Sequence, residues 1–195
     1  MKTSRLLPYL GLCLFVLAAA TPDIARADKP AAFIKSAGTQ MVMAARSQSR
    51  ETMAGIIRRY SDLPDIGLHS LGSYRNGLPS SRRNTYYDGV ARFMARYFVE
   101  QAQQHPVAKF QVYTESKKRE WGYEVDSVAT LKDGKQHTLR WHVVPRKGGY
   151  KVRDVSLVGV WITPISMVNQ QRDLFEGYIR DKGGKVTALL SALGS

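Results

Sequence analysis

The sequence predicts an α+β fold, in which helices precede and follow an antiparallel sheet. The hydrophobic period changes near residue 108, from spacings of three and four residues to an alternation of two. Two turn signals, Asp133-Gly134 and Gly148-Gly149, divide the alternating region into consecutive strands. We therefore expect a twisted four-stranded antiparallel sheet over residues 108–162, wrapped by N-terminal and C-terminal helices.

The first 27 residues are typical of a cleavable secretory signal peptide. Lys2 and Arg5 precede the apolar run 6–20, and residues 25–27 read Ala-Arg-Ala, a small-x-small cleavage pattern. An uncleaved membrane anchor is disfavoured because the run is too short to span a bilayer comfortably. We expect residues 28–195 to form a single exported domain in the periplasm, without the only cysteine, Cys13.

Residues 28–107 are expected to be mostly helical. Apolar residues recur at helical spacing from Phe33 to Ala45, and Ser49 is a candidate N-cap for a second helix that ends near Tyr60. A short helix should start near Asp65, after an interruption at residues 62–65.

A loop over residues 76–80 should lead into the longest helix. Ser80 or Ser81 could cap this helix, which should run to about Gln104, because His105-Pro106 ends it. Its aromatic and aliphatic residues lie on one face.

The four expected strands start at Ala108 and then cover residues 121–131, 136–144 and 150–161. Alternation places Leu139, Trp141 and Val143 on one face of the third strand and His142 on the other. After the sheet, Thr163 is a candidate cap for a C-terminal helix, and a shorter helix should end residues 163–195.

The net charge of +13 points first to a polyanionic partner, either nucleic acid or an anionic membrane surface. Export argues against nucleic acid, and the charge is spread along the chain with no arginine-rich block. Two interpretations of the charge remain: a solvated basic surface, or weak attraction to anionic lipid headgroups. One cysteine excludes a disulfide framework and a thiolate-rich metal site.

The chain carries no recognisable catalytic motif. His137 and His142 are five residues apart on one expected strand, so they point to opposite faces and cannot share a metal. Asp154 stands in an otherwise basic and apolar strand, and Arg172 on the following helix could pair with it in a structural ion pair. We expect no enzyme, no metal site and no cofactor.

Several motifs, in order along the chain, resemble the MlaC family of periplasmic phospholipid-binding proteins. The stretch 150–160, YKVRDVSLVGV, resembles a family pattern that an Arg-x-x-Phe element follows, here Arg172 to Phe175. Leu71 to Tyr74 matches a Leu-Gly-x-aromatic element. Two departures, Tyr150 in place of tryptophan and the residues 161–164, indicate a divergent branch, for example the one associated with hopanoid synthesis.

The resemblance implies a sheet of the nuclear-transport-factor type with an apolar cavity for lipid tails. It also implies a soluble carrier that shuttles phospholipid, or a hopanoid, between an inner-membrane ABC transporter complex and an outer-membrane lipoprotein complex. A monomer is expected. Two alternatives stay open: a small-molecule-binding or enzymatic domain of the same sheet type with Asp154 in a polar cavity, and a structural envelope adaptor.

We expect acyl chains to lie between one sheet face and the helices, with Tyr74 and Arg75 near the mouth of the cavity. The expected lipid-binding residues are Ile57, Tyr60, Tyr74, Met94, Phe98, Val125, Leu139, Trp141, Val143, Val155 and Leu157.

Overall fold

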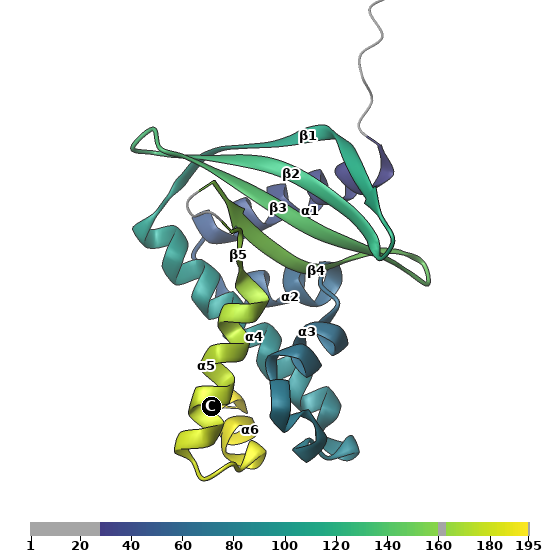
Figure 1. The fold of residues 1–195 in the computed structure, drawn as a ribbon. Helices are drawn as coiled ribbons and strands as arrows, with labels where there is room; N and C mark the ends of the chain where they lie inside the picture. Colours follow the sequence, from purple (N-terminus) through teal and green to yellow (C-terminus); the bar gives the residue numbers. More distant parts are fainter. Residues whose placement is uncertain (1–27, 160–162, 195) are drawn as a thin grey trace, which may run out of the picture.

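The computed structural model describes residues 28–159 and 163–194, so the expected signal peptide lies outside the described residues. Figure 1 shows the sheet above, α1 lying against it, and the remaining helices extending below. The helices and strands follow one another as α1 (Lys29–Arg46), α2 (Arg50–Tyr60), α3 (Leu63–Ser70), the 3-10 helices η1 (Gly72–Gly77) and η2 (Ser80–Arg82), α4 (Arg83–Gln104), β1 (Val107–Arg119), β2 (Gly122–Leu131), β3 (Gln136–Arg146), β4 (Gly149–Val158), β5 (Ile165–Ser166), α5 (Met167–Asp181) and α6 (Val186–Gly194).

Side-chain caps explain where the first three helices begin. Asp28 accepts a hydrogen bond from the N–H of Ala31, and Ser49 caps α2 as expected. Asp62 caps α3. The expected cap of α4 is wrong, because Ser80 and Ser81 lie in η2 and the helix begins after Arg82 without a side-chain cap.

The expected α+β class with an antiparallel sheet is confirmed, but the sheet that residues 28–159 and 163–194 form has five strands, in the order β1-β2-β3-β4-β5. The additional strand, β5, pairs Ile165 with Leu157 and Ser166 with Ser156. Thr163 therefore does not cap the C-terminal helix: the chain first pairs with β4, and Ser166 then caps α5 by accepting from the N–H of Asn169 at 3.0 Å.

A β-bulge in β4 determines which of its side chains face the helices. His142 pairs with Asp154, whereas the next residue, Val143, pairs with Val152, so Arg153 is the extra residue. As a result Val152 and Val155, three residues apart, lie on the same face of the sheet.

The apolar interior consists of two groups of residues. The larger lies among the helices, where Tyr86, Phe175 and Ile57 are among the largest fully buried side chains. The smaller lies between α1 and the sheet and contains Ala31, Ile34, Val125, Trp141, Val143 and Val152.

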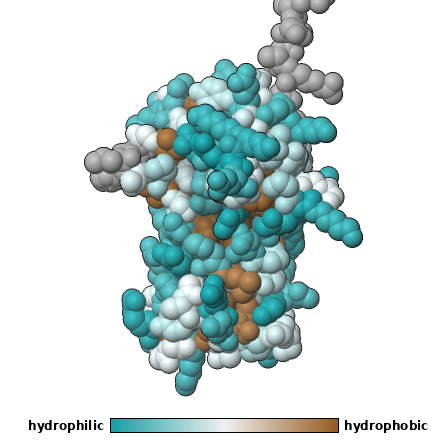
Figure 2. Space-filling model, turned by 45° about the vertical axis from the view of Figure 1, so that its right-hand side comes forward, coloured by the Kyte–Doolittle hydropathy of each residue, from teal (hydrophilic) through white to brown (hydrophobic). Residues whose placement is uncertain are grey.

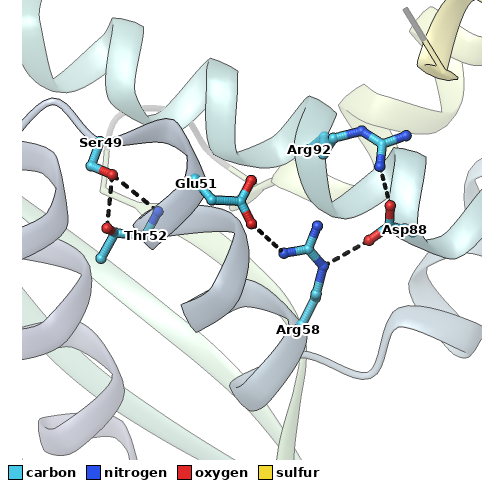
Figure 3. A network of polar contacts seen from close by, with 6 residues as sticks. All are labelled: Ser49, Glu51, Thr52, Arg58, Asp88 and Arg92. Carbon is cyan, nitrogen blue, oxygen red and sulfur yellow. Dashed lines mark hydrogen bonds and ion pairs between the residues drawn. The ribbon is translucent and has the colours of Figure 1, made fainter.

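A polar network fixes α2 against α4 (Figure 3). Arg58 donates to Asp88 on α4 at 2.7 Å and to Glu51 at 3.2 Å, and Arg92 pairs with the same aspartate. Arg92 also donates to the carbonyl of Leu193 at 3.2 Å, which ties α6 to α4. The outer surface turned to the viewer in Figure 2 is largely hydrophilic, with apolar side chains gathered mainly across its middle and lower half.

Candidate ligand-binding groove

A groove with a volume of about 1140 Å³ lies between α1, the C-terminal part of α4 and one face of the sheet. This volume slightly exceeds the usual range for sites that take small molecules, about 300–1,000 Å³. Its inner wall is apolar, with Met41 and Ala45 from α1, Phe98 from α4, and Phe110 and Trp141 from the sheet. The arrangement can surround an extended hydrocarbon group.

A narrower space of about 40 Å³ adjoins the inner end of the groove. Met41, Phe98, Trp141, Val155 and Met167 line both spaces. The narrow space continues toward α2, where its further lining includes Ile57, Tyr60 and Met94. We refer to the two spaces together as the slot.

Eight of the eleven side chains expected from the sequence line the slot, namely Ile57, Tyr60, Met94, Phe98, Leu139, Trp141, Val155 and Leu157. Val125 and Val143 do not line it. They are fully buried in the smaller core group beneath Ala31 and Ile34, because the N-terminal half of α1 covers that end of the sheet.

Tyr74 and Arg75 are also misplaced by the sequence-based expectation. Both lie in η1, which packs against α5: the N–H of Ser73 donates to Glu176 at 2.7 Å. Tyr74 packs against the helical core rather than in the slot. Its Leu-Gly-x-aromatic context therefore serves helix packing in this structure.

Trp141 has a fixed orientation in the wall of the groove. Its side chain is 4% exposed, and its indole Nε1 donates to Ser127 Oγ at 2.8 Å. The ring of Phe110 meets it edge-on, with 6.2 Å between the ring centroids. Phe110 in turn lies against Gly38, where the backbone of α1 has no Cβ to exclude the ring.

Sequence reasoning missed the contribution of α1 and β1 to the groove. Gly38, Met41 and Ala45 form part of a regular helical stripe that is also typical of a filled core, so periodicity alone could not assign them. The small residues on this stripe were the available signal, because they leave room between a helix and a sheet.

Polar residues gather where the groove opens at the C-terminal ends of α1 and α4. Arg46, Lys132, His105 and His137 line it there. Among the residues that the structure describes, no aspartate or glutamate lines the groove. Arg46 Nη2 donates to the carbonyls of Val107 and Ala108 at 3.3 and 3.0 Å, which holds the guanidinium at the opening.

The expected ion pair between Asp154 and Arg172 does not form. Asp154 Oδ1 instead accepts from the N–H of Val155 at 2.8 Å and of Val168 at 3.1 Å, so the carboxylate stabilises the start of α5. Arg172 Nη2 lies 3.7 Å from Asp173 Oδ1. Asp154 still ties helix to sheet, but through the backbone N–H of Val168.

Asp154 also borders a polar cleft of about 360 Å³ between α3, α5 and the sheet. Two polar contacts join the elements around this cleft. Arg153 on β4 forms an ion pair with Asp65 on α3 at 2.7 Å, and His69 Nε2 on α3 lies at hydrogen-bond distance, 2.8 Å, from Asn169 Oδ1 on α5. Burial lowers the pKa of His142, partly offset by the nearby Asp154 and Glu124 carboxylates. The two polar contacts join α3 to the sheet and to α5.

Within residues 28–159 and 163–194, no group of three or more His, Cys, Asp or Glu side chains could hold a metal ion. In the same part of the chain, no helix is long and apolar enough to cross a membrane.

Comparisons with known proteins agree with the fold and with the motifs. No curated protein sequence matches the chain significantly. The fold is similar to a solved structure of a phospholipid-binding protein from Ralstonia solanacearum in complex with a phospholipid. The TM-score is 0.58 at 15% sequence identity, and the match covers 84% of this chain and 95% of that chain. The model of the MlaC protein family matches residues 35–195. This chain therefore belongs to the MlaC protein family.

Proposed function

We propose that the chain is a phospholipid carrier that holds the acyl chains of its ligand in the slot. The observation that carries this proposal is the apolar groove of about 1140 Å³, continued inward by a narrower space lined by Ile57 and Met94. The phospholipid bound by the Ralstonia solanacearum protein, which has a similar fold, supports the same ligand class.

The physical need for such a carrier follows from the cost of exposing acyl chains to water. Each CH₂ group contributes about 0.8 kcal/mol, so two chains in water cost on the order of 20 kcal/mol. A groove walled by Phe98, Phe110 and Trp141 removes most of that cost while the headgroup stays at the opening. Such a carrier requires no catalytic residue.

The proposed place of action is the periplasm, between an inner-membrane ABC transporter complex and an outer-membrane lipoprotein complex. Membership of the MlaC family and the signal-peptide pattern of residues 1–27 support this placement. In this role the protein receives lipid at one membrane complex and releases it at the other.

Native mass spectrometry of the gently purified protein tests the proposal. We expect a phospholipid that co-purifies with the wild-type chain and is reduced in Ala102→Trp, because Ala102 lines the groove and an indole would fill part of it. Ala32→Trp is the matched control, since Ala32 is exposed on α1 and does not line the slot.

Both variants are first checked by circular dichroism and thermal unfolding. A wild-type protein without lipid would overturn the proposal, as would a folded Ala102→Trp variant with the full lipid content. A co-purifying hopanoid would overturn the assignment to phospholipid, but the proposed function as a lipid carrier would stand.

A further inference from the structure

The opening of the groove is positively charged. Within the described part of the chain, the permanent cations that line the groove are Arg46 and Lys132, and no carboxylate lines it. This contrasts with the inner wall of the groove, which is apolar. A charged headgroup therefore finds its cationic partners at the opening.

Both cations belong to the same corner of the fold. Arg46 donates to the carbonyls of Val107 and Ala108, and the N–H of Lys132 donates to the carbonyl of Pro106 at 2.9 Å. The start of β1 thus anchors both residues, one from the last turn of α1 and the other from the turn between β2 and β3. Two positive charges from residues anchored to the same short segment suit a ligand with several acceptor oxygens.

The nearby carboxylates are already paired with other cations. Glu100 on α4 pairs with Arg50 at 3.2 Å, and Asp133, next to Lys132, pairs with Lys135 at 3.0 Å. Neither Arg46 nor Lys132 has an ion-pair partner among the residues that the structure describes.

Two helix C-termini also end at this corner, α1 at Arg46 and α4 at Gln104. Each contributes a partial negative charge of about half a unit. Two full positive charges exceed this sum, and Arg46 already offsets the end of its own helix. The opening therefore keeps a net positive charge.

Building on the proposed lipid-carrier function, we propose that Arg46 and Lys132 form a binding site for the phosphate of the lipid headgroup. This site favours lipids whose headgroup carries a net negative charge over zwitterionic lipids with the same acyl chains. The guanidinium offers N–H donors in a fixed planar array, and the ammonium adds a second point charge.

The test uses the purified full-length exported protein and vesicles of equal parts phosphatidylglycerol and phosphatidylcholine with identical acyl chains. After incubation, the protein is separated from the vesicles, and mass spectrometry gives the ratio of the two lipids it carries. A cation near an anionic lipid contributes about 1 kcal/mol, so we expect phosphatidylglycerol to be favoured about fivefold for each cation.

The variant Arg46→Gln with Lys132→Gln should bring the ratio close to one, mainly through a lower uptake of phosphatidylglycerol. Arg82→Gln with Lys118→Gln is the matched control. It removes the same two charges from exposed residues of η2 and β1 that do not line the groove, and it should keep the wild-type ratio. Added salt should weaken the preference of the wild-type protein, because ions screen partly exposed charges.

Equal uptake of both lipids by the wild-type protein would overturn the headgroup site and leave the carrier function standing. The same holds if the control variant loses the preference as far as the Arg46 and Lys132 variant does, because the effect would then come from overall charge. A protein that takes up neither lipid would overturn the proposed function itself.

Discussion

Replacement of Gly38 by alanine tests how closely α1 approaches the sheet beside the groove. A Cβ at this position would lie 2.3 Å from Cε1 and 2.4 Å from Cζ of Phe110. Favourable contact between carbon atoms begins at about 3.5 Å, so the ring would have to retreat by roughly 1 Å or more. The open space next to the ring is the groove, because Gly38 and Phe110 both line the groove.

The expected change in stability is the sum of two opposing effects. Overpacking of this kind costs about 1–3 kcal/mol. Alanine in a helix interior gains about 1 kcal/mol over glycine. We therefore expect Gly38→Ala to lower the free energy of unfolding by about 0–2 kcal/mol. The displaced ring should also reduce the amount of lipid carried.

Gly55→Ala is the matched control on α2, where Gly55 is exposed and a Cβ would meet no atom within 4 Å. This control should gain up to about 1 kcal/mol. Adding Phe110→Leu to Gly38→Ala should restore part of the loss, because leucine lacks the two atoms that collide with the new Cβ. Urea unfolding of the single and double variants gives the coupling between positions 38 and 110.

If Gly38→Ala stabilises the protein as much as Gly55→Ala, the close contact between α1 and Phe110 is wrong. Strict additivity of Gly38→Ala and Phe110→Leu would refute the same reasoning. A folded Gly38→Ala variant with an unchanged lipid content would show that the ring does not move into the groove.

Three further predictions concern stability. Trp141→Phe leaves the fully buried hydroxyl of Ser127 without its indole donor and should cost at least about 1–3 kcal/mol of unfolding free energy. Adding Ser127→Ala to this variant should cost little more. A double-mutant cycle in urea that shows no coupling between the two positions would contradict this prediction. Asp154→Ala should cost about 1 kcal/mol through loss of the hydrogen bond from the N–H of Val168 in the first turn of α5, and Asp154→Asn, which keeps an acceptor oxygen, should cost less. Equal losses on thermal unfolding would argue against a role for this hydrogen bond. Hydrogen bonds from Arg140 hold the pKa of Asp126 in the folded protein below its usual value of about 3.9. The ionised Asp126 therefore contributes its full stabilisation above this usual pKa, and the stabilisation is lost as the pH falls through the lower pKa of the folded state. Asp126→Asn should therefore flatten the acid limb of the unfolding free energy below about pH 4, and an unchanged limb would exclude this carboxylate as its source.

The sequence predicted the class of fold because local patterns determine most of its elements. Alternation in β3 correctly placed Leu139 and Trp141 on the face that lines the groove. The strand β5 escaped prediction because two residues cannot show a period, and their pairing with β4 is a long-range contact.

The site was harder to predict, since its boundary depends on how α1 lies across the sheet. Val125 and Trp141 pair across neighbouring strands, yet only Trp141 reaches the slot, because α1 buries Val125 completely. Asp154 was correctly singled out as a link between sheet and helix, but the partner was wrong: a backbone N–H at a helix start gives no pattern in the sequence. The tight contact of Gly38 with Phe110 joins residues from two elements, so the sequence pattern could not predict it either.

The position of β1 at the rim of the sheet has a consequence for the behaviour of the protein at high concentration. A terminal strand of 13 residues is a template on which a second chain could add its own strand, the first step of aggregation. The last turn of α1 and its N-cap occupy backbone groups at the start and in the middle of this strand. Arg46 donates to the carbonyls of Val107 and Ala108, and the N–H of Asp28 donates to the carbonyl of Thr114 at 3.0 Å. The helix that walls the groove thus also shields the strand most exposed to unwanted self-association.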